Sequence, residues 1–309
     1  MLRALLLCTA LLQIQAGAAE SSVAAPLAAK SLLLAVARAG RNLVAVGDRG
    51  HVLVSSDEGR TWTQRIVPAR AMLTGVSFPD GQHGWAAGHD GVILATADGG
   101  ATWARQDGGG ELDTIYLDVL FRDARHGCVV GAYGKFLFTA DGGRTWTAER
   151  PDADEVHYNR IVAGAGDRLY LVGESGTLLT SADGGAKWSR LEVPYDGSLF
   201  GLLPGPADTL VAFGLRGHIL MSTDLGRSWA PVASGSTALL MAGAVLEDGT
   251  LVLAGQGGNF FLSRDGGASF TAWKPAEVSG SVAAIIETTD GALVAVGETG
   301  AVRVQRAAR

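Results

Sequence analysis

The segment that decides the fold is Ser55-Ser56-Asp57-Glu58-Gly59-Arg60-Thr61-Trp62. A similar box of eight residues, Ser/Thr-x-Asp-x-Gly-x-x-aromatic, returns five more times along the chain. The aspartates of the six boxes lie 41 to 43 residues apart, at Asp57, Asp98, Asp141, Asp183, Asp224 and Asp265. Six copies at so constant a spacing indicate a repeat architecture, in which each unit is one supersecondary element.

A second pattern, Gly-x-x-Gly between two short apolar runs, precedes each box and occurs once more after the last one. In the first unit, Gly47 and Gly50 lie between the apolar runs 43–46 and 52–54. This pattern indicates a tight β-hairpin, because the second glycine takes positive φ without strain. The first glycines of the copies are Gly47, Gly88, Gly131, Gly173, Gly214, Gly255 and Gly297. The chain therefore contains seven units.

Each unit predicts four strands, which in the second unit are residues 73–78, 84–87, 92–95 and 102–105. Such units arranged in a ring form a β-propeller, which leaves no long exposed sheet edge. We therefore predict an all-β, seven-bladed β-propeller. The box would be the turn between the third and fourth strands, with its aspartate accepting hydrogen bonds from turn N–H groups. The six aspartates are thus predicted to be structural, and at one per blade they form no metal site.

The N-terminus predicts an export signal over residues 1–19, followed by one propeller over 20–309. Arg3 precedes the apolar run 4–12, and small residues follow at 16–19. This order is typical of a cleaved signal peptide. The seventh unit lacks a box and a fourth strand. In the other units the box aromatic residue precedes the next hairpin glycine by 26 to 28 residues, and counting back 26 or 27 residues from Gly47 predicts that residues 20–25 supply that strand and close the ring.

Net charge and cysteine content limit the kinds of function that the chain can have. The net charge of -6 argues against a nucleic-acid binder, which needs a surplus of Lys and Arg. After signal removal Cys128 is the one cysteine, and its place three residues before a hairpin glycine predicts a core residue, not a nucleophile. We expect no cofactor, no metal and no transmembrane segment in the mature chain, and the export signal predicts a monomer in the periplasm.

The box resembles that of sialidases and some other glycoside hydrolases. Sialidases bind the substrate carboxylate with three arginines from different blades. Among the predicted innermost strands of this chain, Arg160 is the one arginine at the aligned entrances. Glycoside hydrolysis also needs two facing carboxylates, and no pair stands out in the spacing. A glycan-binding or glycoside-hydrolysing propeller therefore stays as the alternative function.

The resemblance is closer to the Ycf48/HCF136-like photosystem II assembly (stability) factors and their relatives in non-photosynthetic bacteria. It rests on the seven repeats, the glycine hairpin, the box, the segment His83-Gly84-Trp85-Ala86-Ala87-Gly88 and the export signal. The resemblance implies a non-enzymatic propeller that holds a membrane-protein subunit during assembly. The client would be part of photosystem II in a phototroph, and of an envelope or transporter complex elsewhere.

Loops on a rigid scaffold are the usual place for binding residues. The hairpin tips and the connections between units are expected on one face, with acidic charge around the third and fourth units and arginines elsewhere. We predict that this face docks a protein. The candidate contact residues are Arg49, Arg70, Tyr133, Tyr158, Arg160 and Arg216.

Overall fold

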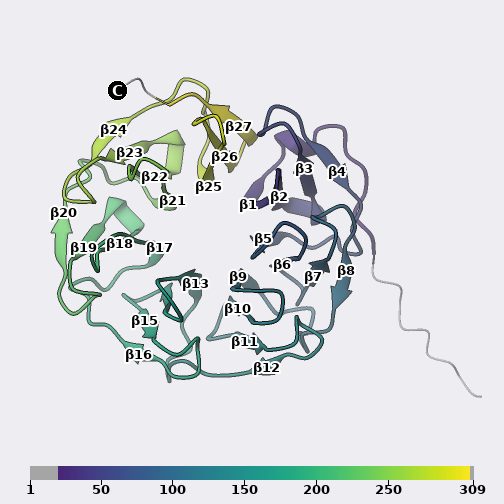
Figure 1. Cartoon of the computed structure of the whole chain (residues 1–309), viewed down its shortest axis with the longest axis horizontal. Coiled ribbons are helices and arrows are strands. Elements are labelled where there is room, and N and C mark those ends of the chain that lie inside the picture. Colours follow the sequence, from purple (N-terminus) through teal and green to yellow (C-terminus); the bar gives the residue numbers. More distant parts are fainter. Residues whose placement is uncertain (1–19, 307–309) are drawn as a thin grey trace, which may run out of the picture.

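The computed structural model describes residues 20–306, and it shows seven small antiparallel sheets arranged in a ring (Figure 1). Within these residues the only helical elements are four 3-10 turns of three residues each. The prediction of an all-β, seven-bladed β-propeller is confirmed. In each blade the first strand lies at the centre of the ring and the last lies at its rim (Figure 1).

The strands follow one another in chain order within every blade. Blades one to three are formed by β1 (Leu33–Ala39), β2 (Asn42–Gly47), β3 (Val52–Ser55), β4 (Thr63–Arg65), β5 (Leu73–Ser77), β6 (Gly84–Gly88), β7 (Ile93–Thr96), β8 (Ala104–Gln106), β9 (Tyr116–Phe121), β10 (Gly127–Gly131), β11 (Phe136–Thr139) and β12 (Thr147–Ala148). Blades four to seven are formed by β13 (Tyr158–Ala163), β14 (Leu169–Gly173), β15 (Leu178–Ser181), β16 (Ser189–Arg190), β17 (Leu199–Pro204), β18 (Leu210–Gly214), β19 (Ile219–Ser222), β20 (Ala230–Val232), β21 (Leu240–Val245), β22 (Leu251–Gly255), β23 (Phe260–Ser263), β24 (Thr271–Trp273), β25 (Val282–Glu287), β26 (Leu293–Gly297) and β27 (Gly300–Val304).

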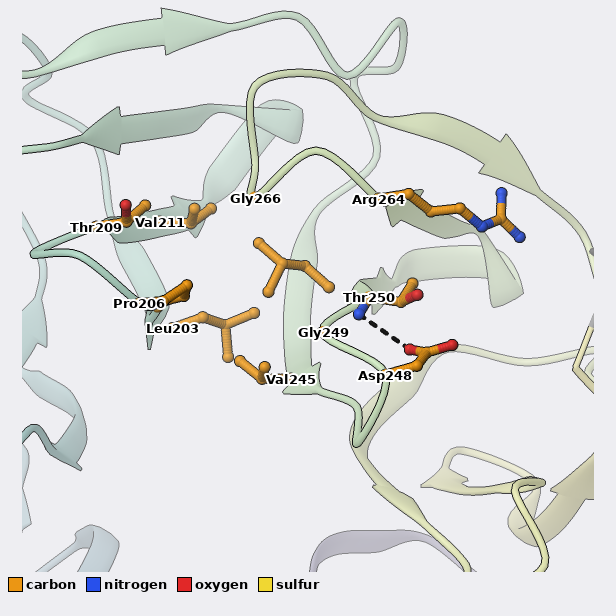
Figure 2. A pocket seen from close by; sticks show the side chains of 12 residues that line it. Leu203, Pro206, Thr209, Val211, Val245, Asp248, Gly249, Thr250, Arg264 and Gly266 are labelled. Atoms are coloured by element: carbon orange, nitrogen blue, oxygen red, sulfur yellow. Dashed lines mark hydrogen bonds between the residues drawn. The ribbon is translucent and has the colours of Figure 1, made fainter.

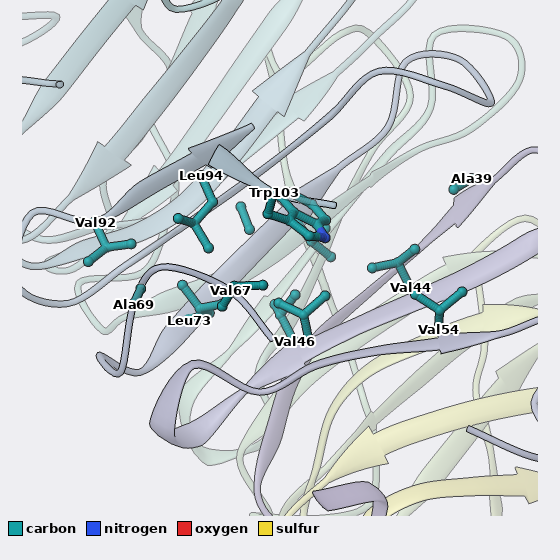
Figure 3. Close-up of a cluster of buried hydrophobic side chains, with 13 residues drawn as sticks. Ala39, Val44, Val46, Val54, Val67, Ala69, Leu73, Val92, Leu94 and Trp103 are labelled. Carbon is teal, nitrogen blue, oxygen red and sulfur yellow. The ribbon is translucent and has the colours of Figure 1, made fainter. Parts of the chain in front are cut away.

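The core lies between the blades. The second strand of each blade, such as β6 or β10, is buried on both faces, because each face packs against a neighbouring sheet. Between blades one and two, Val44 and Val46 pack with Leu73, Leu94 and Trp103 (Figure 3). Similar clusters recur around the ring, so packing between blades holds the ring together.

The hairpin glycine fits its predicted role. In blade one, η2 (Asp48–Gly50) links β2 to β3, and Gly50 has a φ of 68°. A Cβ added there would lie 2.2 Å from the carbonyl oxygen of Ala69, in the connection to blade two. The glycine therefore allows the hairpin and the connection between blades to touch on one face of the ring.

The boxes are self-contained turns. Asp57 accepts hydrogen bonds from the Ser55 hydroxyl at 2.8 Å, from the Thr61 N–H at 2.9 Å and from the Thr61 hydroxyl at 2.6 Å. The Thr61 bonds lead in lowering the pKa of Asp57 to about 2. The Ser55 hydroxyl also accepts the Gly59 N–H at 2.8 Å. The same network recurs at Asp98, Asp141, Asp224 and Asp265, and in part at Asp183, where Lys187 replaces the hydroxyl residue.

The prediction that residues 20–25 supply the fourth strand of blade seven is wrong. The seventh sheet has three strands, β25-β26-β27, and residues 20–25 form no strand. They run instead beside the outer strand of blade one, where the Ser22 N–H donates to the Val67 carbonyl at 2.8 Å. The Gln64 side chain accepts the Ala25 N–H at 2.8 Å. These bonds to blade one take the place of a ladder with β27. The predicted signal over residues 1–19 lies outside the described residues.

Side-chain contacts close the ring instead. Leu33 and Leu43 of blade one lie in one buried cluster with Val294 and Val296 of blade seven. Polar bonds add to this packing, because Arg38 of β1 donates to the Glu287 carbonyl at 2.9 Å and Arg303 of β27 donates to the Glu58 carbonyl at 2.9 Å. Blades one and seven are thus joined without a shared sheet.

Candidate functional site

The ring has two chemically different faces. One carries the hairpins between second and third strands together with the connections between blades, and we call it the hairpin face. The contact of Gly91 with Thr114, whose carbonyl accepts its N–H at 2.9 Å, is typical of it. The opposite face carries the boxes and the turns between first and second strands, and we call it the box face. There the Gly99 N–H donates to the Gln82 carbonyl at 2.9 Å.

Three of the predicted contact residues occupy the same place in their hairpins. Arg49, Tyr133 and Arg216 each follow the first hairpin glycine by two residues and have φ values of 53°, 55° and 57°. The corresponding residue of blade six is Gly257. A side chain with a Cβ pays a steric cost in this left-handed region, so long residues there need a compensating reason. All three side chains are exposed on the hairpin face.

The two hairpin arginines are accessible. The Arg49 side chain is 79% exposed, and its contact with Asp48 at 3.4 Å is a surface ion pair of little strength. Arg216 borders a pocket of about 610 Å³ whose other side is formed by Pro231 of β20 and by Ser236 of the connection to blade six. Both guanidinium groups are therefore placed to meet an acidic partner.

Arg70 is exposed in the connection between blades one and two, and it forms an ion pair with Glu20 at 3.0 Å. Through this pair it contacts the N-terminal segment that runs along blade one. The pair is open to solvent, so the segment gains little stability from it.

Tyr133 is 66% exposed, and its ring meets His157 edge to face with 4.7 Å between centroids. A second such pair lies one blade further along, where Tyr195 stacks on His218 at 4.3 Å and its hydroxyl donates to the Leu215 carbonyl at 3.1 Å. Each pair combines an aromatic ring with polar atoms, which is the amphipathic chemistry that protein contacts use.

Sequence reasoning missed Tyr195, His218 and the 82% exposed Leu112 as contact candidates. Leu112 is a lone apolar residue in a polar connection, which is a signal that the sequence does contain. The pairing of Tyr195 with His218 joins two loops, so only the fold could show it.

The prediction that Tyr158 is a contact residue is wrong. Its side chain has no exposed surface, since it is the first residue of β13 and points between blades three and four. Burial raises the pKa of its hydroxyl to about 12. It is a core residue and does not contribute to a contact surface.

Arg160 lies on the innermost strand β13 and not on a hairpin tip. It is half-buried, and its Nε has no hydrogen-bond partner among the described residues. Burial raises the pKa of Asp118, on the neighbouring innermost strand, and the positive charge of Arg160 opposes that rise. Arg160 therefore interacts with Asp118 among the innermost strands and does not lie on the hairpin face.

Part of the acidic charge predicted around blades three and four is paired within the protein. Arg190 bonds Asp152 at 2.7 Å and Asp154 at 3.1 Å. Burial opposes ionisation of Asp152, but the Arg190 bonds outweigh it and lower the pKa of that carboxyl. Arg150 is paired with Glu155. These ion pairs offset part of the acidic charge near Tyr133.

The reactive groups of the described chain are dispersed. Residues 20–306 contain no group of three His, Cys, Asp or Glu side chains able to hold a metal ion. Cys128 is buried as expected, and burial raises the pKa of its thiol to about 12, which removes nucleophilic character. In the same residues no helix is long and apolar enough to cross a membrane. The exposed arginines and aromatic pairs suit binding by surface contact.

Comparisons with known proteins agree with this geometry. A sequence model of the family described as photosynthesis system II assembly factor YCF48 matches residues 109–306, more than half of the chain. No curated protein matches the sequence significantly.

Solved structures show the same architecture. A structure described as YCF48 bound to D1 peptide is 18% identical with a TM-score of 0.74, over 94% of this chain and 95% of that one. YCF48 from Cyanidioschyzon merolae is 19% identical with a TM-score of 0.73, over 91% and 97%. The WD40 propeller domain of Doa1 is 11% identical with a TM-score of 0.71, over 94% and 97%. At these identities the likeness shows the fold alone.

Proposed function

The chain belongs to the family of photosynthesis system II assembly factors YCF48, and we propose that it is an exported, non-enzymatic propeller whose hairpin face holds a membrane-protein subunit during assembly. In a phototrophic host the client is a subunit of photosystem II and the location is the thylakoid lumen. In another host the client belongs to an envelope or transporter complex and the location is the periplasm.

One observation carries this proposal: Arg49, Tyr133 and Arg216 stand at left-handed hairpin positions that would suit glycine better. A residue with a Cβ costs roughly 1 kcal/mol there relative to glycine. The same left-handed position carries a residue with a Cβ in five blades: in blades one, three and five it presents a long side chain to solvent, and in blades two and four it carries the shorter Asp90 and Ser175. Recurrent local strain under exposed arginine and tyrosine supports selection for contact.

The form of the partner is proposed from the same surface. The two Tyr–His pairs offer apolar area, while Arg49 and Arg216 offer positive charge to a partner with acidic residues. A similar propeller, YCF48, has been solved with D1 peptide bound. We therefore take the contacted region of the client to be an extended peptide segment that carries carboxylates.

Affinity capture from native membranes tests the proposal. The tagged protein is crosslinked mildly and its membrane partners are quantified for the wild type and for Arg49→Glu/Arg216→Glu. Reversal of two exposed charges facing an acidic segment should lower capture by about tenfold or more.

Arg227→Glu is the matched control, because Arg227 is an exposed arginine of a box, on the opposite face. If Arg49→Glu/Arg216→Glu and Arg227→Glu captured equal amounts of the membrane partners, the hairpin face would not be the docking surface. Turnover of a sialoside or a β-glucan by the pure protein would contradict the non-enzymatic part and restore the glycoside-hydrolase alternative.

A further inference from the structure

The box face carries a pocket that the proposed function does not use. It lies between blades five and six and has a volume of about 600 Å³. Leu203, Pro206 and Val245 give it an apolar wall, and Arg264 stands on its rim (Figure 2). Val245 is 43% exposed, so apolar surface here is left open to water.

The corresponding place between blades two and three is filled. There the rings of Trp85 and Phe121 stack with 3.5 Å between centroids, and Trp146 of the box meets Phe121 edge to face at 5.9 Å. Trp85 stands three residues before its hairpin glycine, and Val211 stands at that position in blade five.

Phe121 stands ten residues before its hairpin glycine, and Val245 stands at that position in blade six. Two valines thus replace two aromatic rings at the pocket between blades five and six. The Trp85 indole also donates to the carbonyl of Gly142 at 3.2 Å, and the corresponding box glycine, Gly266, lines the pocket. The pocket therefore has the same surroundings as the place where an aromatic side chain is packed between blades two and three.

The rim of the pocket offers one uncommitted positive charge. Arg264 is exposed, and no ion pair or hydrogen bond of its side chain is found within residues 20–306. The nearby carboxylate of the rim, Asp248, is held by Arg306 at 2.6 Å. Figure 2 shows the Arg264 side chain extending away from Leu203 and Pro206. An anion bound to it would lie beyond the apolar wall.

Arg264 is also unusual among the boxes. It is the second residue of its box, and the other five boxes carry small residues there: Ser56, Ala97, Ala140, Ala182 and Thr223. The charge is therefore no requirement of the turn. Its presence beside the hollow junction, and at no other box, points to a ligand.

We propose that this pocket binds a protein segment that presents a Trp or Phe side chain close to an Asp or Glu. The aromatic ring lies against Pro206 and Val245, and the carboxylate pairs with Arg264. The site is on the face opposite the hairpins and is independent of the proposed client contact. The propeller would then bind two protein segments at once, one on each face.

Methyl NMR of the full propeller with labelled Leu and Val tests the site directly, because Leu203 and Val245 line it. The probe is acetyl-Gly-Trp-Asp-Gly-amide, with the Trp-to-Ala and Asp-to-Asn peptides as ligand controls. The probe should shift these methyl signals saturably, and each control peptide should bind about tenfold more weakly or worse.

Two protein variants complete the test. Val245→Asp and Arg264→Glu should each weaken probe binding about tenfold, while Ile66→Asp and Arg227→Glu, exposed residues outside the pocket, should leave it unchanged. Thermal melting checks that all four remain folded.

Absence of saturable shifts, or equal affinity for Val245→Asp and the wild type, would overturn the proposal. Indole-3-propionate binding as tightly as the peptide would assign the pocket to a free small molecule and contradict the protein segment. Concentration-dependent self-association that Val245→Asp removes would assign it to a second copy, with the same consequence.

Discussion

The junction between blades two and three and the junction between blades five and six join sheets of the same strand order but contain different side chains. The first is filled by the Trp85–Phe121 stack, and the second has Val211 and Val245 in those positions and an open pocket. Both junctions keep their hairpin glycines and their box hydrogen bonds. The turns therefore set the ring, and the residues between the blades are free to serve stability in one place and binding in another.

The largest effect is expected from emptying the filled junction. Trp85→Ala should lower the free energy of unfolding by about 3–5 kcal/mol, because it removes a buried ring and leaves a cavity against Phe121. Val211→Ala, at the equivalent position, should cost about 2 kcal/mol, since only two methyl groups are lost. Urea denaturation measures both. Equal losses would show that the two junctions are energetically alike.

A smaller effect is expected from filling the hollow junction. Val245→Phe adds the ring that Phe121 supplies between blades two and three, and it covers exposed apolar surface. It should raise the free energy of unfolding by about 1 kcal/mol. Denaturation of this variant beside the wild type gives the measurement. Destabilisation would mean that the pocket cannot receive a ring, which would also weaken the proposed aromatic site.

The smallest difference is expected in acid. Asp141 belongs to the box of the filled junction and Asp265 to that of the hollow one, and hydrogen bonds from their turns lower both pKa values to about 2 from the ordinary 3.8. Because the folded pKa is depressed, this stabilisation is complete above about pH 4 and is lost as the pH falls towards 2.

Melting temperatures recorded between pH 7 and pH 2 should therefore fall below pH 4. Asp141→Asn and Asp265→Asn should each flatten that slope slightly and to the same extent, since the two boxes have the same network. If only one of the two variants changed the fall of the melting temperature below pH 4, the contribution of a box to stability would depend on the side chains packed in its junction.

Most of the fold could be predicted from the sequence, because glycines and boxes mark turns that are formed locally. Gly47 and Asp57 recur at a fixed spacing, and each acts on residues within its own blade or the next connection. The position of residues 20–25 could not be predicted in this way. Counting repeats places a segment along the chain, but whether it meets β27 or β4 depends on the bonds of Ser22 and Gln64, which are contacts between distant residues.

The candidate site was predictable only in part. The hairpin tips Arg49, Tyr133 and Arg216 follow from the repeat, because their exposure is set by the local turn. Tyr158 was assigned wrongly, since its position at the start of an innermost strand says nothing about the direction of its side chain. The pocket at Val245 could not be predicted, because its openness depends on how the neighbouring blade packs.

Within residues 20–306 the sheet of blade seven has three strands where the other blades have four, and this difference has a consequence for symmetry. Seven blades with the same strands would present a partner with seven nearly equivalent orientations. The sheet of β25, β26 and β27 has one strand fewer than each of the other six sheets. This difference distinguishes blade seven from the other blades at the rim of the propeller. A partner that spans the rim at blade seven and the hairpin face would engage the ring in a single rotational register.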